Sequence, residues 1–158
     1  MKEGRCQMVK LEGGVSVCPQ IEAIVKASIP VCAHIGLTPQ SINMFGGFKV
    51  QGKSAEAAKQ IIEDAKRIEA AGASMVVLEG IPTPLAKVIT ETLTIPTIGI
   101  GAGKYCDGQV LVYQDMLGMH LRMIFLVINR YLKEGNQIGT EMLDEIERAT
   151  HYFSLNHL

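Results

Sequence analysis

The sequence has little net charge, no long apolar run and no closely paired cysteines. Its formal net charge is -1, so it has no electrostatic footprint for nucleic acid or for an acidic membrane surface. The longest apolar run, 123–128, is too short to span a bilayer. None of the four cysteines belongs to a C-x-x-C pair, which favours reduced thiols in a cytoplasm. These exclusions leave small-molecule chemistry as the expected class of function.

One short motif occurs twice in the chain. Residues 8–13 read MVKLEG and residues 75–80 read MVVLEG, so five of the six positions agree, and an Ile-Pro dipeptide follows each copy at a similar distance. An apolar run bounded by glycine is typical of a buried strand. Glu12 and Glu79 fall where these strands leave the core. The repeat therefore predicts two strands that present an acid at the same end.

Strands and helices alternate along the chain, which has 158 residues and is long enough for one domain with a core. The predicted strands cover 8–12, 31–34, 75–79, 97–100 and 110–113. Helices are predicted from Pro19 to a stop at Pro30, from Ser54 as N-cap to Gly72, and from Pro82 to Pro96, and further helices are predicted over 119–132 and 140–152.

This alternation indicates parallel βα units. With acids and glycines at the strand exits, it suggests an α/β fold of the (β/α)₈ TIM-barrel type, whose chemistry lies at that face. Five strands are fewer than eight, so we expect one partial barrel domain over 1–158, with βα units over 1–117 and divergent helices over 118–158. The alternatives are part of a barrel that another chain completes, or a smaller open sheet.

Three charged or titratable residues lie near the predicted strand ends. Lys10 and Glu12 are two positions apart and therefore share a face. They could serve an inward-facing site, or they could form a salt bridge at the strand end. His34 closes the predicted strand 31–34 and could donate to a substrate oxygen near neutral pH, although a structural role is the alternative.

Two glycine-containing segments also bear on function. Residues 40–53 form a long predicted loop that either folds over a ligand as a lid or packs on the surface. Gly99, Gly101 and Gly103 invite comparison with a phosphate cradle, but their spacing is not G-x-G-x-x-G. Close backbone approach is the other explanation for these glycines.

Four segments together carry a family resemblance. They are VKLEGG at 9–14, PVCAHIGLTPQSIN at 30–43, FGGFKVQG at 45–52 and IGIGAG at 98–103. In this order, within a stretch from about 7 to 117, the sequence resembles the ketopantoate hydroxymethyltransferase (3-methyl-2-oxobutanoate hydroxymethyltransferase) family, and specifically its carboxyl-terminal part.

The resemblance implies a magnesium-dependent, cytoplasmic, homo-oligomeric barrel enzyme of pantothenate biosynthesis. Such an enzyme transfers a hydroxymethyl group from methylenetetrahydrofolate to 3-methyl-2-oxobutanoate, giving ketopantoate through a magnesium-stabilised enolate. By this resemblance Lys10 binds the keto acid, Glu12 belongs to the magnesium site directly or through water, and Glu79 is the catalytic base. The resemblance also places His34 near the substrate.

The chain departs from the family pattern in two places. The family's first three strands, which bring two aspartates to the metal, have no counterpart, and residues from 118 onward fit poorly. Three hypotheses follow. The chain is a working or ancestrally working hydroxymethyltransferase, either by itself or as half of a split enzyme completed by an N-terminal chain; it is a truncated, catalytically inactive remnant; or it is a different barrel enzyme that uses phosphate at 99–103.

Overall fold

The computed structural model describes residues 3–41 and 49–116. The chain divides into two compact units, Met1–Val110 and Leu111–Leu158, and α5 (Tyr113–Met116) is the described element of the second unit. The helices predicted over 119–132 and 140–152 lie outside the described residues, as does the middle of the long loop, 42–48. A single barrel domain over 1–158 stays a prediction.

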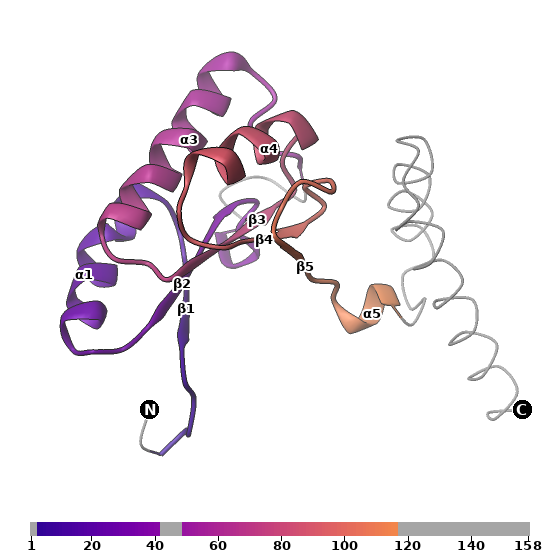
Figure 1. Cartoon of the computed structure of the whole chain (residues 1–158). Coiled ribbons are helices and arrows are strands. Elements are labelled where there is room, and N and C mark those ends of the chain that lie inside the picture. Colours follow the sequence, from indigo (N-terminus) through magenta and orange to yellow (C-terminus); the bar gives the residue numbers. More distant parts are fainter. Residues whose placement is uncertain (1–2, 42–48, 117–158) are drawn as a thin grey trace, which may run out of the picture. The chain divides into compact units, whose positions relative to one another are not determined.

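The first unit contains one five-stranded parallel sheet whose strands follow one another in chain order (Figure 1). Its strands are β1 (Val9–Glu12), β2 (Val31–Gly36), β3 (Met75–Glu79), β4 (Thr97–Ile100) and β5 (Gly108–Gln109). A parallel sheet in strict chain order is what consecutive βα units produce. The α/β class is confirmed, and the sheet is consistent with part of a TIM-type barrel.

The helices cover one face of this sheet (Figure 1). They are α1 (Cys18–Lys26), α3 (Ala55–Ala70) and α4 (Thr83–Thr92), with single 3₁₀ turns η1 (Val15–Val17) and η2 (Pro39–Ser41). As predicted, the Ser54 hydroxyl caps α3 by accepting from the Ala57 amide at 3.2 Å, and Gly72 follows the helix with a φ of +97°. Within the described residues no helix has both the length and the apolar character to cross a membrane.

Alternate residues of the central strands face the helices and form the core. Those from β2 and β3 are Val31, Ala33, Ile35, Val76 and Leu78, and they pack against apolar side chains of the three helices. Because side chains alternate along a strand, His34 and Glu79 lie on the opposite face, called the helix-free face below because α1, α3 and α4 of the described residues do not cover it. The fold thus separates an apolar core from a face that carries ionisable groups.

The last predicted strand, 110–113, is wrong. The structure places β5 at Gly108–Gln109, two residues earlier. Asp107 fixes this register because its carboxylate accepts from the Thr97 amide at 2.8 Å and from the Thr97 hydroxyl at 3.0 Å. Val110 makes one more backbone hydrogen bond to β4 and is 47% exposed, and Val112 is 46% exposed. Among the described residues, these apolar side chains therefore stay outside the core of the sheet.

Two predicted boundaries also differ from the structure. β2 continues two residues beyond His34 to Gly36, so the histidine lies inside the strand and not at its end. Gly36 pairs with Glu79 of β3, and this extra pairing explains the longer strand. Helix α1 ends at Lys26, short of the predicted stop at Pro30, because the chain turns through Ser28 with a φ of +61°.

Candidate active site at the strand ends

The candidate site lies on the helix-free face at the carboxyl ends of β1, β2 and β3. Glu12 on β1 is the register partner of His34 on β2, and Glu79 on β3 is the partner of Gly36, two residues further along β2. The pleat therefore directs all three side chains to the same face. The prediction that two strands present an acid at the same end is confirmed.

His34 lies between the two acids. Its Nδ1 is 3.3 Å from Oε1 of Glu12, and its Nε2 is 3.1 Å from Oε2 of Glu79. The imidazole is only 2% exposed. Neither contact has hydrogen-bond alignment, so both ring nitrogens are buried without a hydrogen-bond partner. Buried polar atoms are nearly always hydrogen-bonded in native proteins, and an unaligned pair at strand ends marks a place where a ligand group could bind.

Glu12 is held by its neighbours on both carboxylate oxygens. Lys10 Nζ donates to Oε1 at 3.2 Å, and the backbone amide of Gln40 donates to Oε2 at 3.0 Å. The Glu12 side chain is 7% exposed, whereas that of Lys10 is 48% exposed. The shared face of Lys10 and Glu12 is confirmed and the salt bridge is present, but the lysine is not buried. Its ammonium group remains accessible to an anionic ligand.

The backbone around Glu79 is fixed on both sides. The Leu37 amide donates to the Glu79 carbonyl at 2.8 Å, and the Gly80 amide donates to the Ile100 carbonyl at 2.9 Å. The Glu79 side chain is 19% exposed. A carboxylate that is partly accessible on a rigid strand end has the placement that a general base requires.

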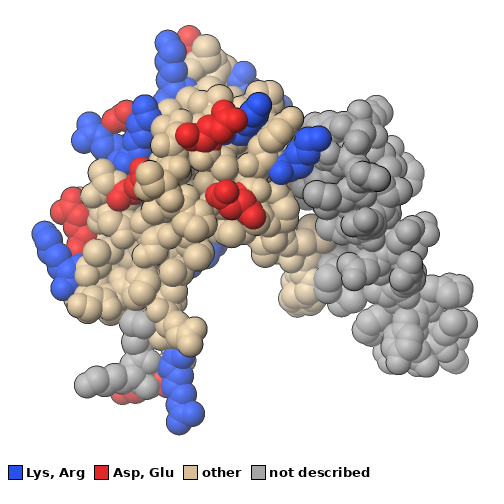
Figure 2. Space-filling model, in the orientation of Figure 1, with Lys and Arg blue, Asp and Glu red and all other residues tan. Residues whose placement is uncertain are grey.

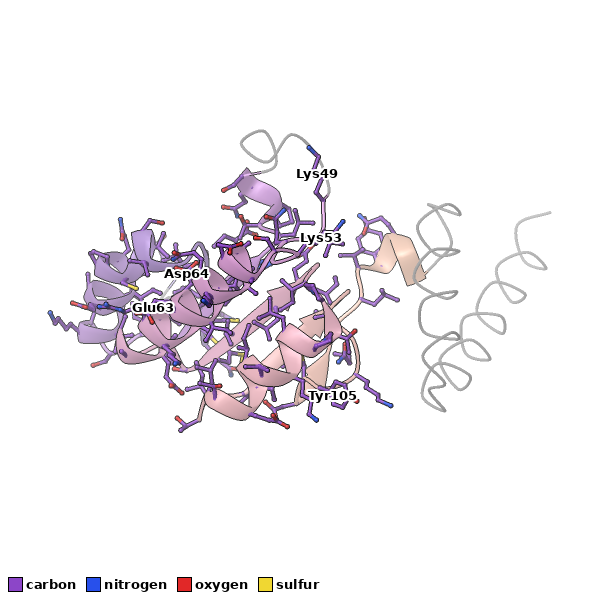
Figure 3. All side chains as sticks on the ribbon, turned by 90° about the horizontal axis from the view of Figure 1, so that it is seen from above. Lys49, Lys53, Glu63, Asp64 and Tyr105 are labelled. Carbon is purple, nitrogen blue, oxygen red and sulfur yellow. The ribbon has the colours of Figure 1, made fainter. Side chains whose placement is uncertain are left out.

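Asp64 of α3 is a supporting residue that the sequence analysis missed. Its Oδ1 accepts from the Val15 amide at 3.1 Å and from Gln60 Nε2 at 3.1 Å. A Cβ at Gly14 would lie 2.6 Å from that same Oδ1, so the glycine allows the close approach. Asp64 and its neighbour Glu63 lie along α3 in Figure 3. Asp64 therefore anchors the turn that follows Glu12, a contact too distant in sequence to be read from spacing.

The glycines at the end of β4 serve close packing. A Cβ at Gly103 would lie 2.8 Å from the Cβ of Thr83, and one at Gly99 would lie 2.9 Å from Oε1 of Gln109. Both glycines therefore allow neighbouring side chains to pack directly against the backbone. This geometry favours the close-approach explanation over a phosphate cradle.

The described residues do not by themselves fit a magnesium ion. Within 3–41 and 49–116, no three histidine, cysteine, aspartate or glutamate side chains are grouped so that they could hold a metal. Both oxygens of Glu12 already accept hydrogen bonds. Magnesium prefers six oxygen ligands in near-octahedral geometry, so a complete site needs ligands beyond those described.

Basic and acidic side chains are interspersed on the face shown in Figure 2.

Comparison with known proteins identifies the family. The model of the family described as ketopantoate hydroxymethyltransferase matches residues 1–148. The chain belongs to the ketopantoate hydroxymethyltransferase family. The family resemblance stated on the four motifs is thereby confirmed, and the match extends beyond residue 117, where the stretch that carries this resemblance ends. Members of this family are hydroxymethyltransferases.

Curated relatives agree with this assignment to the ketopantoate hydroxymethyltransferase family. The chain is 73% identical over 146 residues to the 3-methyl-2-oxobutanoate hydroxymethyltransferase of Clostridium kluyveri, covering 92% of this chain and 52% of the relative. It is 60% identical over 150 residues to the enzyme of the same name from Enterococcus faecalis, covering 93% of this chain and 54% of the relative. The chain thus spans about half the length of the curated relatives it matches.

Proposed function

We propose that this chain takes part in hydroxymethyl transfer from methylenetetrahydrofolate to 3-methyl-2-oxobutanoate, giving ketopantoate. The names of the relatives support the substrates. The single observation that carries the proposal is the row Glu12, His34 and Glu79, in which a buried imidazole lies 3.3 Å and 3.1 Å from two carboxylates at the strand ends. Catalysis in TIM-type barrels takes place at this end of the strands.

Glu79 is the proposed base. It removes the proton from C3 of the keto acid, which leaves an enolate whose C3 then bonds to the methylene carbon carried by the folate. The two bonds from that carbon to folate nitrogens break, and water supplies the hydroxyl oxygen. The two folate nitrogens take up one proton from that water and the proton that Glu79 removed from C3. The partial exposure of the Glu79 side chain, 19%, lets substrate reach the carboxylate while protein excludes bulk water.

Lys10 and His34 are proposed to bind the keto acid. The side chain of Lys10 is about half exposed and its ammonium pairs with Glu12, so that group can also bind the substrate carboxylate as a compact positive charge. The ring of His34 has nitrogens without aligned partners and can turn to donate to a substrate oxygen beside Glu79.

Glu12 is the described residue proposed for the magnesium site that the family implies. Its oxygens are engaged by Lys10 and Gln40, which favours a contact with the ion through water over direct ligation. The remaining ligands would come from outside the described residues. We also propose that this chain corresponds to the carboxyl-terminal part of the family's enzymes. We further propose that it is located in the cytoplasm and forms homo-oligomers.

A second candidate is a catalytically inactive remnant, or one half of a split enzyme. The observation that favours it is the coverage of only about half of each relative, together with five strands among the described residues, where a TIM-type barrel has eight. Both candidates make the same family assignment and differ in what the chain does alone.

Proton exchange at C3 tests the proposed function. The chain is incubated with 3-methyl-2-oxobutanoate and magnesium in deuterated water without folate, and loss of the C3 proton signal is followed by NMR. We expect Glu79→Gln to slow exchange by about 10²- to 10⁴-fold, the usual contribution of a positioned base. Glu63→Gln is the matched control, because Glu63 lies on α3 and pairs with Arg67. A folded parent chain without exchange would favour the second candidate.

A further inference from the structure

The end of the loop between β2 and α3 is bound to the residue that follows the proposed base. The backbone amide of Gln51 donates to the Gly80 carbonyl at 2.8 Å, and Gly80 comes directly after Glu79. At Gly52 the backbone has a φ of +71°, and a Cβ there would lie 2.5 Å from a side-chain carbon of α4. Residues 49–53, called the rim segment below, therefore have a fixed backbone beside the candidate site.

The rim segment carries two lysines on an otherwise uncharged stretch. Lys49 and Lys53 lie on either side of Gln51 in the sequence, and both are exposed. The sequence from 40 to 55 contains no other charged residue. Figure 3 shows both lysines on the segment that leads into α3, apart from Tyr105. The rim thus has two positive charges and no negative one, on a chain whose net charge is -1.

The two lysines differ from basic residues elsewhere in the unit. Lys26, Arg67 and Lys87 each pair with an acid one helical turn away, at 3.9, 2.8 and 3.7 Å. Lys104, in the loop after β4, lies over the Tyr105 ring at 5.6 Å. Within the described residues, neither lysine of the rim segment forms an ion pair or such a ring contact. Two ammonium groups of this kind beside a site favour an anionic ligand.

The folate of the proposed reaction carries negative charge far from its reacting carbon. That carbon lies between two nitrogens at the pterin end of methylenetetrahydrofolate, and the glutamate at the other end carries two carboxylates. Transfer to C3 of the keto acid brings the reacting carbon beside Glu79. The charged end stays in water, because burying an unpaired charge is costly. The glutamate is therefore expected at the rim of the site, where the strand-end loops meet solvent.

We propose that Lys49 and Lys53 bind the glutamate carboxylates of the folate co-substrate. This role rests on the proposed function and adds to it the residues that hold the second substrate. Lysine presents a compact charge on a flexible stem, so both ammonium groups can reach a glutamate in solvent while Gln51 holds their backbone in place. Exposed ion pairs are individually weak. The two lysines therefore set how tightly the folate binds and take no part in proton transfer at Glu79.

Binding of two folates that differ only in the glutamate tests this role. Tetrahydrofolate carries the glutamate and tetrahydropteroate lacks it, and the dissociation constant of each for the full chain is measured by anaerobic titration calorimetry. We expect the parent chain to bind tetrahydrofolate about three- to tenfold more tightly, the effect of two exposed ion pairs. In Lys49→Gln/Lys53→Gln this preference should fall below about twofold, through weaker binding of tetrahydrofolate alone.

The matched control is Lys26→Gln/Lys66→Gln. It removes the same number of positive charges, near the carboxyl-terminal ends of α1 and α3. These helix ends lead back to the starts of strands, away from the strand ends that form the site. We expect the control to keep the preference of the parent chain, and urea unfolding establishes that both double variants are folded.

The salt dependence of the parent chain gives a measurement that needs no variant. The preference for tetrahydrofolate should shrink as salt is raised from about 0.05 M to about 0.5 M, because salt screens exposed charges. The proposal is overturned by a parent chain that binds no tetrahydrofolate or binds both folates equally, and by a preference that salt leaves unchanged. It is also overturned if the preference survives in Lys49→Gln/Lys53→Gln or falls equally in the control.

Failure of this role is distinct from failure of the proposed function, because C3 proton exchange is measured without folate. A parent chain that exchanges the C3 proton but shows no preference for the glutamate contradicts only the role of the two lysines. A parent chain that shows the preference without proton exchange supports that role and contradicts Glu79 as the base.

Discussion

Replacing Gly36 by alanine is expected to disturb the candidate site through the backbone that holds Glu79. Gly36 ends β2 with a φ of +89° and is the register partner of Glu79. A Cβ at this position would collide with the backbone carbonyl oxygen of Glu79 and lie 2.8 Å from Cγ2 of Ile81. Backbone atoms cannot rotate away as a flexible side chain can, so β2 and β3 must separate where the acid is held.

Two costs add in the free energy of unfolding of Gly36→Ala. The left-handed backbone costs a residue with a Cβ about 1–2 kcal/mol, and overpacking a filled site costs about 1–3 kcal/mol. The sum is about 2–5 kcal/mol, which lowers the urea midpoint by about 1–3 M for a typical slope. Displacing Glu79 by about 1 Å would slow C3 proton exchange by about 10²-fold, because reaction rates depend steeply on the position of the base.

Gly101→Ala is the matched control for this experiment. Gly101 also has a positive φ, +61°, but the nearest atom to its added Cβ is 3.8 Å away in Gly80. This variant should lose only the backbone contribution of about 1–2 kcal/mol and keep its exchange rate. Urea unfolding and NMR exchange would be measured on both variants. If Gly36→Ala unfolds at the same midpoint as Gly101→Ala, the collision with Glu79 has no energetic consequence and the reasoning is refuted.

Two further predictions concern groups outside the site. Burial favours the neutral form of Glu69, but hydrogen bonds from the Thr94 amide and hydroxyl and from the Ile95 amide outweigh this effect and lower the pKa of the carboxyl group. Glu69→Gln should therefore destabilise the chain by about 1–2 kcal/mol at pH 7, and this difference in the free energy of unfolding should shrink as the pH falls below about 4.3. Urea unfolding at several pH values measures the difference, and a constant value down to pH 3 would contradict the prediction. Burial raises the pKa of the Cys32 thiol, against a lowering effect of Lys10, whereas Cys6 is exposed. Iodoacetamide should therefore modify Cys6 well before Cys32 in the folded chain, as followed by mass spectrometry. Equal rates of modification would show that the helix-free face opens readily.

The repeat in the sequence predicted the most important part of the site. Glu12 and Glu79 could be placed at the same end because each closes an apolar run before a glycine, and the structure brings them to either side of one residue. Local patterns of this kind are read from neighbouring residues, so they also located α3, with its cap at Ser54 and its stop at Gly72. Most of the sheet was predictable for the same reason.

Features that depend on distant residues were not predictable. The position of β5 is set by hydrogen bonds between Asp107 and Thr97, ten residues earlier. The apolar residues that follow β5, at 110–113, have the composition of a strand and were therefore predicted in its place. The end of β2 depends on pairing of Gly36 with β3. Spacing could suggest that His34 was functional, but it could not show that both ring nitrogens would face carboxylates from two other strands.

The position of His34 also limits how the site can evolve or be re-engineered. One planar, rigid ring lies between the two acids, whose backbone positions are set by the pairing of β1 and β3 with β2. A ligand that tilts the ring toward one carboxylate necessarily withdraws it from the other. Substitutions of the acids on β1 and β3, which look independent in sequence, are therefore expected to be coupled through His34 on β2.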